Sequence, residues 1–388
     1  MISLIDLLGA LVRIPSPNPP GDTRAIAAFI AATLQTAGAV VTTHAPAVKP
    51  EAISVIATIG SGDPVVMLHA HIDTVPIAVN EAKHWSVDPY AAAIQDGKLY
   101  GKGAVDDKAP LAAMMRVLIE NAARNLHGTL VLVAAAEEET GGVLGTRWLA
   151  DAGHLPLCDF IVVGEQTGNH IAAAHKGVVR ATIQTTGRSV HATNPDRGVN
   201  AITAMAHVVL AFAAYHSELA ARLHPLVGHP TCNVGVIRGG STANAVPDSC
   251  EIFLDRRMIP DENPHVVQQE MVDIVRALQP ELAPAQVEIR NFQVSDWFGS
   301  SVDSPLARAF AEVVRADGRD PAPIGYLPGS DAKHLKGALK PGGEMIIFGP
   351  GSYEVAHAYD EYVEIDALET TARTLGRFIE RTMLNGAS

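Results

Sequence analysis

The sequence is poor in cysteine and in positive charge, and each shortage excludes a class of protein. Cys158, Cys232 and Cys250 are the only cysteines in 388 residues. Their odd number and wide spacing favour neither a disulfide framework nor a thiolate zinc site, so buried, reduced thiols are expected. The formal net charge of -13 argues against a nucleic-acid or anionic-membrane partner, which needs a basic surface. A small anionic substrate is not excluded, because local cations or a bound metal can override the overall charge.

Long apolar runs, targeting signals and repeats are also missing. No apolar run is long enough to span a bilayer, and no internal repeat or low-complexity linker is visible. Residues 1–8 lack the basic start and the small-residue cleavage site of a signal peptide. With 47% hydrophobic and 18% charged residues, the chain is predicted to be a globular, cytoplasmic protein with no membrane or nucleic-acid partner.

The order of the predicted elements indicates an α/β fold. Apolar segments typical of buried strands alternate with helical segments, as in a sheet that helices cover on both faces. The strands in this first part are predicted at residues 53–59, 65–68, 129–135 and 161–163. A helix at 305–315, a strand at 345–348 and a final helix from Asp366 resume the pattern near the end. We expect a mixed, mostly parallel sheet flanked by helices, formed by residues 1–177 and 293–388.

An inserted segment interrupts this pattern. Residues 178–186 alternate like a half-exposed strand, and helices are predicted at 199–215 and 264–278, with short strands between them. That β-α-β-β-α grouping fits a small α+β domain with a ferredoxin-like order of elements. We therefore predict a second domain at residues 178–292. A chain of 388 residues is long enough for about two to three domains.

A strand that ends in His71-Ile72-Asp73 carries the first functional signal. Positions two apart in a strand share a face, so His71 and Asp73 can act together. A metal-binding imidazole whose ring is oriented by a carboxylate has this arrangement. His69 lies on the same face of the strand. Since His-x-Asp arises often by chance, the rest of the chain must supply further ligands.

Other turns and strand ends also carry acidic or imidazole side chains. They are Asp106 in a glycine-rich turn, Glu138 and Glu139 after one strand, Glu165 after another, and His357 after the strand at 345–348. Alone, Asp106 could cap the helix that follows, and the glutamates could form a solvated turn. In α/β proteins, however, the carboxyl ends of buried strands hold the functional site. Adjacent glutamates also suit a division of labour, in which one binds metal and the other moves protons.

Taken together, these motifs resemble the dinuclear zinc family of amidohydrolases and exopeptidases that includes acetylornithine deacetylase, succinyl-diaminopimelate desuccinylase, aminoacylases and glutamate carboxypeptidase. The resemblance covers nearly the whole chain in the right order. It implies two divalent metal ions, zinc in the first place, with cobalt or manganese as alternatives. The implied ligands are His71, Asp106 and Glu165 for one ion, and Asp106, Glu139 and His357 for the other. Asp106 would bridge the two ions.

The same resemblance implies catalytic roles. Two zinc ions that share a carboxylate lower the pKa of a bridging water towards about 7. Glu138 would act as general base, taking a proton from that water and returning it to the leaving amine. Asp73 would orient His71. His191, in a motif that resembles the family's lid, would reach the active site of the other subunit and stabilise the oxyanion, which implies a homodimer through the inserted lid domain. A loop-surface histidine is the alternative for His191 taken alone.

Substrate contacts are implied in two segments of the inserted domain. Asn244 and Arg257 would bind the substrate's carboxylate, because a guanidinium fork suits that group. Arg256, beside Arg257, is expected to be a solvated neighbour. Further contacts are implied at Lys176, Gly329 and Ser330.

Two stretches favour the acetylornithine deacetylase branch, namely residues 174–177 and the segment 349–362. The desuccinylase usually has an arginine-containing segment at positions 175 and 176. Gln166 and Ala109 depart from a usual proline and a usual glycine, but neither is an implied ligand. We expect a hydrolase of linear amide C–N bonds that cleaves an N-acyl amino acid such as N-acetylornithine. The alternatives are a carboxypeptidase, dipeptidase or desuccinylase with the same site; a non-catalytic binding protein would have lost ligands or the base.

Overall fold

The computed structural model describes residues 2–78 and 80–384, which fall into two compact units. Unit 1 comprises Met1–Ala173 with Ser300–Ser388, and unit 2 comprises Ala174–Gly299. The chain passes between them through β8 (Ala172–His175) and β13 (Phe298–Gly299), which pair antiparallel. The boundaries expected from the sequence, at 177/178 and 292/293, fall inside two strands of unit 2.

Unit 1 is built around a mixed sheet whose central strands are parallel. The order is β1-β2-β6-β3-β7-β15-β8, with β14 paired to β8. β6, β3, β7 and β15 run parallel to their neighbours among these four, whereas β1-β2, β2-β6 and β15-β8 are antiparallel pairs. These strands are β1 (Val40–His44), β2 (Ser54–Ser61), β3 (Val65–His71), β6 (Gly128–Ala135), β7 (Cys158–Val163), β14 (Ile324–Tyr326) and β15 (Leu339–Ile347). The predicted mixed α/β sheet is confirmed.

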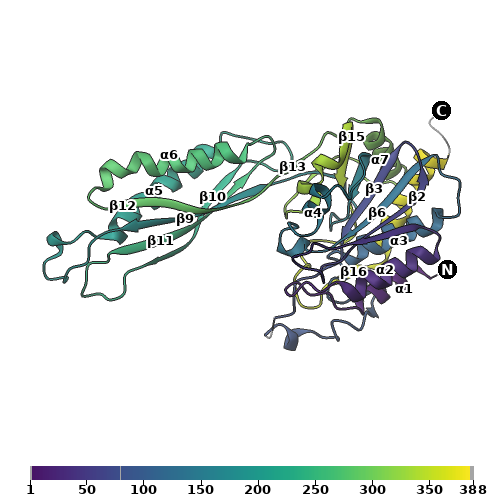
Figure 1. The fold of residues 1–388 in the computed structure, drawn as a ribbon, viewed down its shortest axis with the longest axis horizontal. Coiled ribbons are helices and arrows are strands. Elements are labelled where there is room, and N and C mark those ends of the chain that lie inside the picture. Colours follow the sequence, from purple (N-terminus) through teal and green to yellow (C-terminus); the bar gives the residue numbers. More distant parts are fainter. Residues whose placement is uncertain (1, 79, 385–388) are drawn as a thin grey trace. The chain divides into compact units, whose positions relative to one another are not determined.

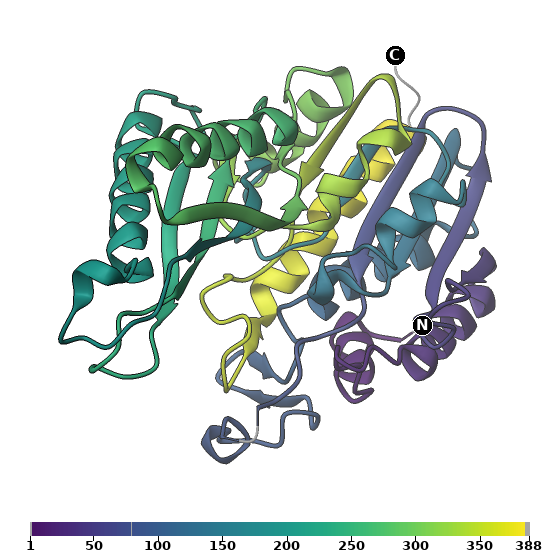
Figure 2. The ribbon, with the colours of Figure 1, turned by 60° about the vertical axis from the view of Figure 1, so that its left-hand side comes forward.

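Helices flank this sheet (Figure 1). They are α1 (Leu4–Val12), α2 (Arg24–Thr36), α3 (Lys108–Asn121), α4 (Thr146–Asp151), α7 (Pro305–Ala316) and α8 (Ile365–Ile379). α3 packs against β3, β6 and α8, which is yellow in Figure 2. A small separate sheet of β16 (Tyr362–Glu364), β5 (Lys98–Tyr100) and β4 (Ala93–Gln95) completes the unit. None of the described helices combines the length and the apolar character that a membrane crossing requires.

Successive side chains of β3 point to opposite faces of the sheet, so the two faces hold different residues. Val66, Leu68 and Ala70 point into the main apolar core, together with residues of α1, α2, α3, α7 and α8. The alternate positions, His69 and His71, therefore face the opposite side, where both are buried. His71 thus ends the strand on the face away from the main core.

Unit 2 has the order β-α-β-β-α-β. Its four strands form an antiparallel sheet, β10-β11-β9-β12, and α5 and α6 contribute to one core with β9 and β11. This order of strands and helices is the predicted ferredoxin-like arrangement. The elements are β9 (Gly177–Thr186), α5 (Ala201–Leu219), β10 (Thr231–Gly239), β11 (Ser249–Met258), α6 (Pro264–Leu282) and β12 (Gln286–Ser295).

The expectation that Arg256 is solvated is wrong. In β11, alternate residues from Cys250 to Met258 are buried, and Arg256 has the inward parity and no exposed surface. Its guanidinium donates to Oε1 of Glu262 at 2.6 Å and to the hydroxyl of Tyr215 at 3.1 Å. Because a buried guanidinium is stable only when paired, these contacts explain its place in the core.

The three cysteines are free and buried, as expected. Burial raises the pKa of the Cys158 thiol to about 12 and that of Cys232 to about 11. Since the thiolate is the reactive form, neither thiol is suited to nucleophilic chemistry or metal binding.

Four phenylalanine rings pack together where α7 and α8 lie against the sheet of unit 1. The ring of Phe310 lies 4.9 Å from Phe348, 5.2 Å from Phe378 and 6.3 Å from Phe160, centroid to centroid. We expect Phe310→Ala to lower the free energy of unfolding by about 3–5 kcal/mol, because it leaves a cavity among these rings. Urea unfolding measures the change. Val40→Ala, at a position 72% exposed, is the control, and a loss below about 1 kcal/mol in Phe310→Ala would contradict this packing.

Candidate metal centre

Four neighbouring strands of unit 1 deliver polar residues to one edge of the sheet. His71 is the last residue of β3, and the short helix Glu138–Thr140 follows β6. Glu165 follows β7, and the loop that holds His357 follows β15. Because these four strands are parallel, their carboxyl ends meet at the same edge. Asp106 joins them from the turn before α3.

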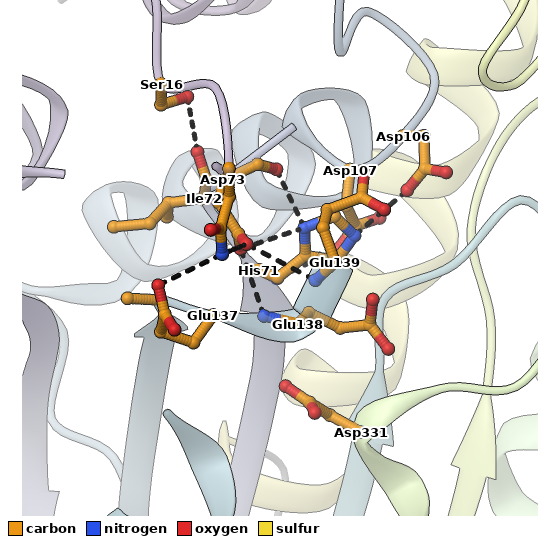
Figure 3. A network of polar contacts seen from close by, with 12 residues as sticks. Ser16, His71, Ile72, Asp73, Asp106, Asp107, Glu137, Glu138, Glu139 and Asp331 are labelled. Carbon is orange, nitrogen blue, oxygen red and sulfur yellow. Dashed lines mark hydrogen bonds and ion pairs between the residues drawn. The ribbon is translucent and has the colours of Figure 1, made fainter. Parts of the chain in front are cut away.

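The carboxylate of Asp106 lies between two imidazoles. Its Oδ1 is 2.9 Å from Nε2 of His71, and its Oδ2 is 3.1 Å from Nε2 of His357. The same Nε2 of His357 is 3.2 Å from Oε2 of Glu139. His71, Asp106 and Glu139 form a group whose potential ligand atoms lie within 4.8 Å of one another (Figure 3). Asp106 therefore offers one oxygen to each side of the centre.

A second group shares His71 and contains Asp107 and Glu165, again with ligand atoms within 4.8 Å of one another. Oδ2 of Asp107 accepts a hydrogen bond from the backbone N of His71 at 3.1 Å. Its Oδ1 is buried and has no hydrogen-bond partner within the described part of the chain. The hydroxyl of Tyr326 lies 3.0 Å from Oε2 of Glu165. Neither Asp107 nor Tyr326 was predicted from the sequence as a site residue.

The ionisable side chains of the centre lie close together, and this shifts their pKa values. Hydrogen bonds to Asp106 and Glu139 raise the pKa of His357 to about 10. Burial alone would raise the pKa of Asp106, but hydrogen bonds from His357 and His71 outweigh it and hold that pKa below its usual range. Burial and the charges of Asp107 and Asp106 raise the pKa of Glu165 well above its usual range. Buried carboxylates that converge on the buried ring of His71 and the half-exposed ring of His357, with one orphaned oxygen on Asp107, fit divalent metal ions.

Metal binding should therefore release protons. With a pKa of about 10, the ring of His357 is protonated throughout the neutral range, and a metal must displace that proton. Affinity for zinc should rise as the pH increases, because fewer protons compete. Titration of the metal-free protein with zinc chloride in a pH-stat at about pH 7 and about pH 9 measures the release. His357→Gln should release fewer protons than the parent, and equal release would contradict this assignment.

Glu138 stands beside the centre without belonging to either ligand group of the described residues. Its Oε1 lies 3.5 Å from Nζ of Lys333, and its side chain is 14% exposed. Burial raises the pKa of Glu138 to about 7, although the charge of Lys333 opposes the shift. A carboxylate that titrates near neutral pH can both accept and donate a proton there.

The carboxylate of Asp73 holds the turn that presents the two glutamates. Its Oδ1 accepts a hydrogen bond from the backbone N of Glu138, and its Oδ2 accepts one from the backbone N of Glu139, each at 3.2 Å. Nδ2 of Asn18 donates to the same Oδ2 at 2.8 Å. The ring of His71 bonds through Nδ1 to the backbone O of Asp73 at 3.0 Å, whereas the carboxylate Oδ1 is 3.6 Å away. Asp73 therefore contacts His71 chiefly through its peptide carbonyl.

The sequence of the chain matches that of a known protein family. The model of peptidase family M20/M25/M40 matches residues 67–381, well over half of the chain. The chain belongs to that family. Acetylornithine deacetylase of Proteus mirabilis (strain HI4320) is 30% identical over 346 residues, 85% of this chain and 83% of that protein. A probable succinyl-diaminopimelate desuccinylase of Staphylococcus aureus (strain MSSA476) is 28% identical over 339 residues, 81% of this chain and 82% of its own. The resemblance noted in the sequence is confirmed.

Solved structures share the fold of this M20 protein. A tripeptidase from Staphylococcus aureus has a TM-score of 0.77 and 23% identity, and the match covers 97% of each chain. A Bacillus subtilis protein described as a dinuclear metal binding peptidase of the M20 family has a TM-score of 0.69 and 18% identity, over 97% of this chain and 96% of its own. As a member of the M20 family, the chain is a hydrolase that acts on amide bonds.

In this M20 hydrolase, His69 belongs to a separate buried network. Its Nε2 lies 2.8 Å from the hydroxyl of Thr146, which donates to Oδ2 of Asp331 at 2.6 Å. Because that hydroxyl gives its proton to Asp331, it accepts a hydrogen bond from the ring of His69. Burial lowers the pKa of His69 to about 4, so the ring is neutral. Among the residues that the structure describes, His69 joins neither ligand group.

The predicted lid residues lie in unit 2. The structure brings His191 and Asn244 onto adjacent segments, where Ala192 N donates to Asn244 O at 2.9 Å. Arg257 is 41% exposed and donates to Oδ1 of Asp255 at 2.6 Å. Nζ of Lys176 donates to the backbone O of His229 at 2.6 Å. Gly329 and Ser330, the other two predicted substrate-binding residues, lie in unit 1. Gly329 is exposed, and the hydroxyl of Ser330 accepts a hydrogen bond from the backbone N of Ala332 at 3.3 Å.

Sequence reasoning missed the side chains that anchor the glutamate turn from behind. Glu137 adopts a left-handed backbone conformation, with φ of 72°. Its Oε1 accepts hydrogen bonds from Lys49 at 2.6 Å and from Asn18 at 3.0 Å. The side chain of Glu137 is thereby held away from the ligand groups. The turn-rich segment around Asn18 was the only local signal for this anchor, and its partners lie about a hundred residues away in the chain.

Proposed function

We propose that this M20 hydrolase is a metal-dependent amidohydrolase that cleaves an N-acyl amino acid of the N-acetylornithine type to a carboxylate and a free amino acid. The arrangement of Asp106 is the observation that supports this best. One of its oxygens faces His71 and the other faces His357, and Glu138 lies beside them outside both ligand groups of the described residues. A shared carboxylate next to an uncommitted base is what two-metal amide hydrolysis requires.

The ligand set supports two divalent ions, zinc in the first place, with cobalt or manganese as alternatives. The solved M20 relative described as a dinuclear metal binding peptidase supports the same number. When bound, the ions supply Lewis acidity and a water acidified towards neutral pH. The residues that would hold them are His71, Asp106 and Glu165 on one side, and Asp106, Glu139 and His357 on the other.

Glu138 moves the proton in this reaction. As a carboxylate it accepts the proton of the attacking water, and as a carboxylic acid it donates that proton to the leaving amine nitrogen, so the amide C–N bond breaks without a net change at Glu138. Its pKa of about 7 serves both halves. Asp73 keeps the Glu138 turn in place through two backbone hydrogen bonds, and Lys333 faces the carboxylate at 3.5 Å.

Unit 2 would supply the remaining contacts. We propose that His191 of a second copy donates to the developing oxyanion, which makes the active protein a homodimer. Asn244, Arg257 and Lys176 would bind the substrate's carboxylate, together with the loop at Gly329 and Ser330. Burial and the positive charges of Arg257 and Arg256 lower the pKa of Lys176.

A second candidate function keeps the site and changes the substrate. The desuccinylase relative at 28% identity favours an N-succinyl substrate, and the fold shared with a tripeptidase favours a small peptide. The chemistry at Glu138 is the same for all three, so only the contacts to the acyl group and the amino acid distinguish them.

Hydrolysis profiling of the zinc-loaded protein separates these functions. We expect kcat/KM for N-acetyl amino acids to exceed that for N-succinyl and N-formyl amino acids and dipeptides by at least about tenfold. Glu138→Gln, prepared in parallel, controls for contaminating hydrolases and should be inactive on every substrate. A preference for N-succinyl amino acids or dipeptides would replace the deacetylase by one of the alternatives.

A further inference from the structure

Glu361 connects the two loops that carry Asp106 and His357. It lies four residues after His357, directly before β16, and its side chain is 1% exposed. Its Oε1 accepts hydrogen bonds from the backbone N of Val105 at 3.0 Å and of Asp106 at 3.2 Å. Its own backbone O accepts one from Gly101 at 2.9 Å. Hydrogen bonds of Glu361 therefore join the loop of His357 to the backbone of Asp106, whose side chain is the shared carboxylate.

Lys102 supplies the positive charge beside Glu361. Its side chain is 1% exposed, and Nζ lies 3.8 Å from Oε2 of Glu361 and 3.7 Å from Oε1 of Glu81. Nζ has no hydrogen-bond partner within the described residues, so these two carboxylates are its nearest compensation. A fully buried ammonium is costly unless it stabilises a charge of opposite sign. Lys102 therefore lies beside Oε2 of Glu361, while Oε1 accepts the two backbone hydrogen bonds.

We infer that Glu361 and Lys102 form a clamp that positions Asp106 and His357 for the second metal ion. The inference rests on the proposed function, because it concerns the affinity of that metal centre. Glu361 contacts no substrate in this arrangement and is a positioning residue. Partners that orient metal ligands in this way typically change metal affinity by about 10- to 100-fold when they are removed.

Two substitutions break the clamp in different ways. Glu361→Gln keeps the shape and one acceptor oxygen, but its NH2 group would face the ammonium of Lys102, so two donors meet. Lys102→Met leaves the carboxylate of Glu361 buried and without its counter-charge. Lys102→Arg keeps the charge and should preserve the clamp. Glu354→Gln, at an exposed glutamate of the same loop, is the matched control.

Zinc affinity, measured by competition with a chelator, tests the clamp. We expect Glu361→Gln and Lys102→Met each to bind at least one zinc ion about 10- to 100-fold more weakly than the parent. Lys102→Arg and Glu354→Gln should bind as the parent does. In Glu361→Gln, kcat should recover at saturating zinc, with KM unchanged. A destabilised but otherwise intact site would show a lower melting temperature and no change in zinc affinity.

The outcomes distinguish this inference from the proposed function. If the parent binds fewer than two ions or fails to hydrolyse any amide, the proposed function is wrong. If the parent binds two ions and folded Glu361→Gln binds both with the parent's affinity, only the clamp is wrong. Should Glu361→Gln fail to fold, parental zinc affinity in Lys102→Met would overturn the clamp in the same way.

Discussion

Replacing Glu138 with alanine is expected to lower kcat by about 10²- to 10⁴-fold while both metal ions stay bound. Glu138 lies outside both ligand groups among the described residues, so its loss should not release an ion. Burial nevertheless raises its pKa to about 7, and its Oε1 lies 3.5 Å from Nζ of Lys333. Without it, the attacking water and the leaving nitrogen lose the side chain that carries the proton between them.

Steady-state kinetics and metal analysis of the same preparation measure both halves of this expectation. Glu138→Asp keeps a carboxylate but withdraws it by one methylene, so it should retain part of the activity. Glu354 is exposed and has no proposed role in the reaction, so Glu354→Gln should match the parent. Hydrolysis at the parental rate in Glu138→Ala would show that another group is the base. Loss of metal in that variant would show that Glu138 is a ligand.

Asp106→Asn is expected to remove the metal centre itself. The carboxylate of Asp106 is within 3.1 Å of an imidazole on each side, so both ion sites depend on it. An asparagine offers one carbonyl oxygen, and its NH2 group cannot bind a metal. Zinc affinity should fall by more than the roughly 100-fold that marks the loss of an outer partner, and activity should be lost with it.

Asp107→Asn is the matched comparison for that experiment. Asp107 is adjacent, is more deeply buried than Asp106, and belongs to the group with His71 and Glu165. If Asp106 is the shared ligand, Asp107→Asn should keep two ions with a smaller loss of affinity. A larger loss of zinc in Asp107→Asn than in Asp106→Asn would move the bridging role to Asp107.

Local patterns were enough to predict most of the elements that position the centre. The apolar run before His71 predicts a buried strand, and the period of two places His71 on one face of it. The apolar runs before Glu138 and Glu165 behave in the same way, so the common edge of the sheet followed from parallel packing. These signals lie within a few residues of each site residue, which is why they were visible in the sequence.

Contacts between distant segments were not predictable. The inward parity of Arg256 depends on which face of β11 packs on α5 and α6, and a charged residue in an alternating strand normally indicates solvent. The clamp of Glu361 and Lys102 joins positions more than two hundred residues apart, and nothing in either local sequence signals it. The side chains of Lys49 and Asn18 contact Glu137 across 88 and 119 residues of the chain.

Anomalous diffraction from crystals of the zinc-loaded protein would show directly whether Asp106 is shared by two ions. We expect two zinc peaks, one beside Oδ1 of Asp106 and His71, and one beside Oδ2 of Asp106, Glu139 and His357. The two zinc ions of such a site lie about 3.5 to 4 Å apart. A single peak would contradict the shared carboxylate, and so would zinc on His69 with His71 turned away.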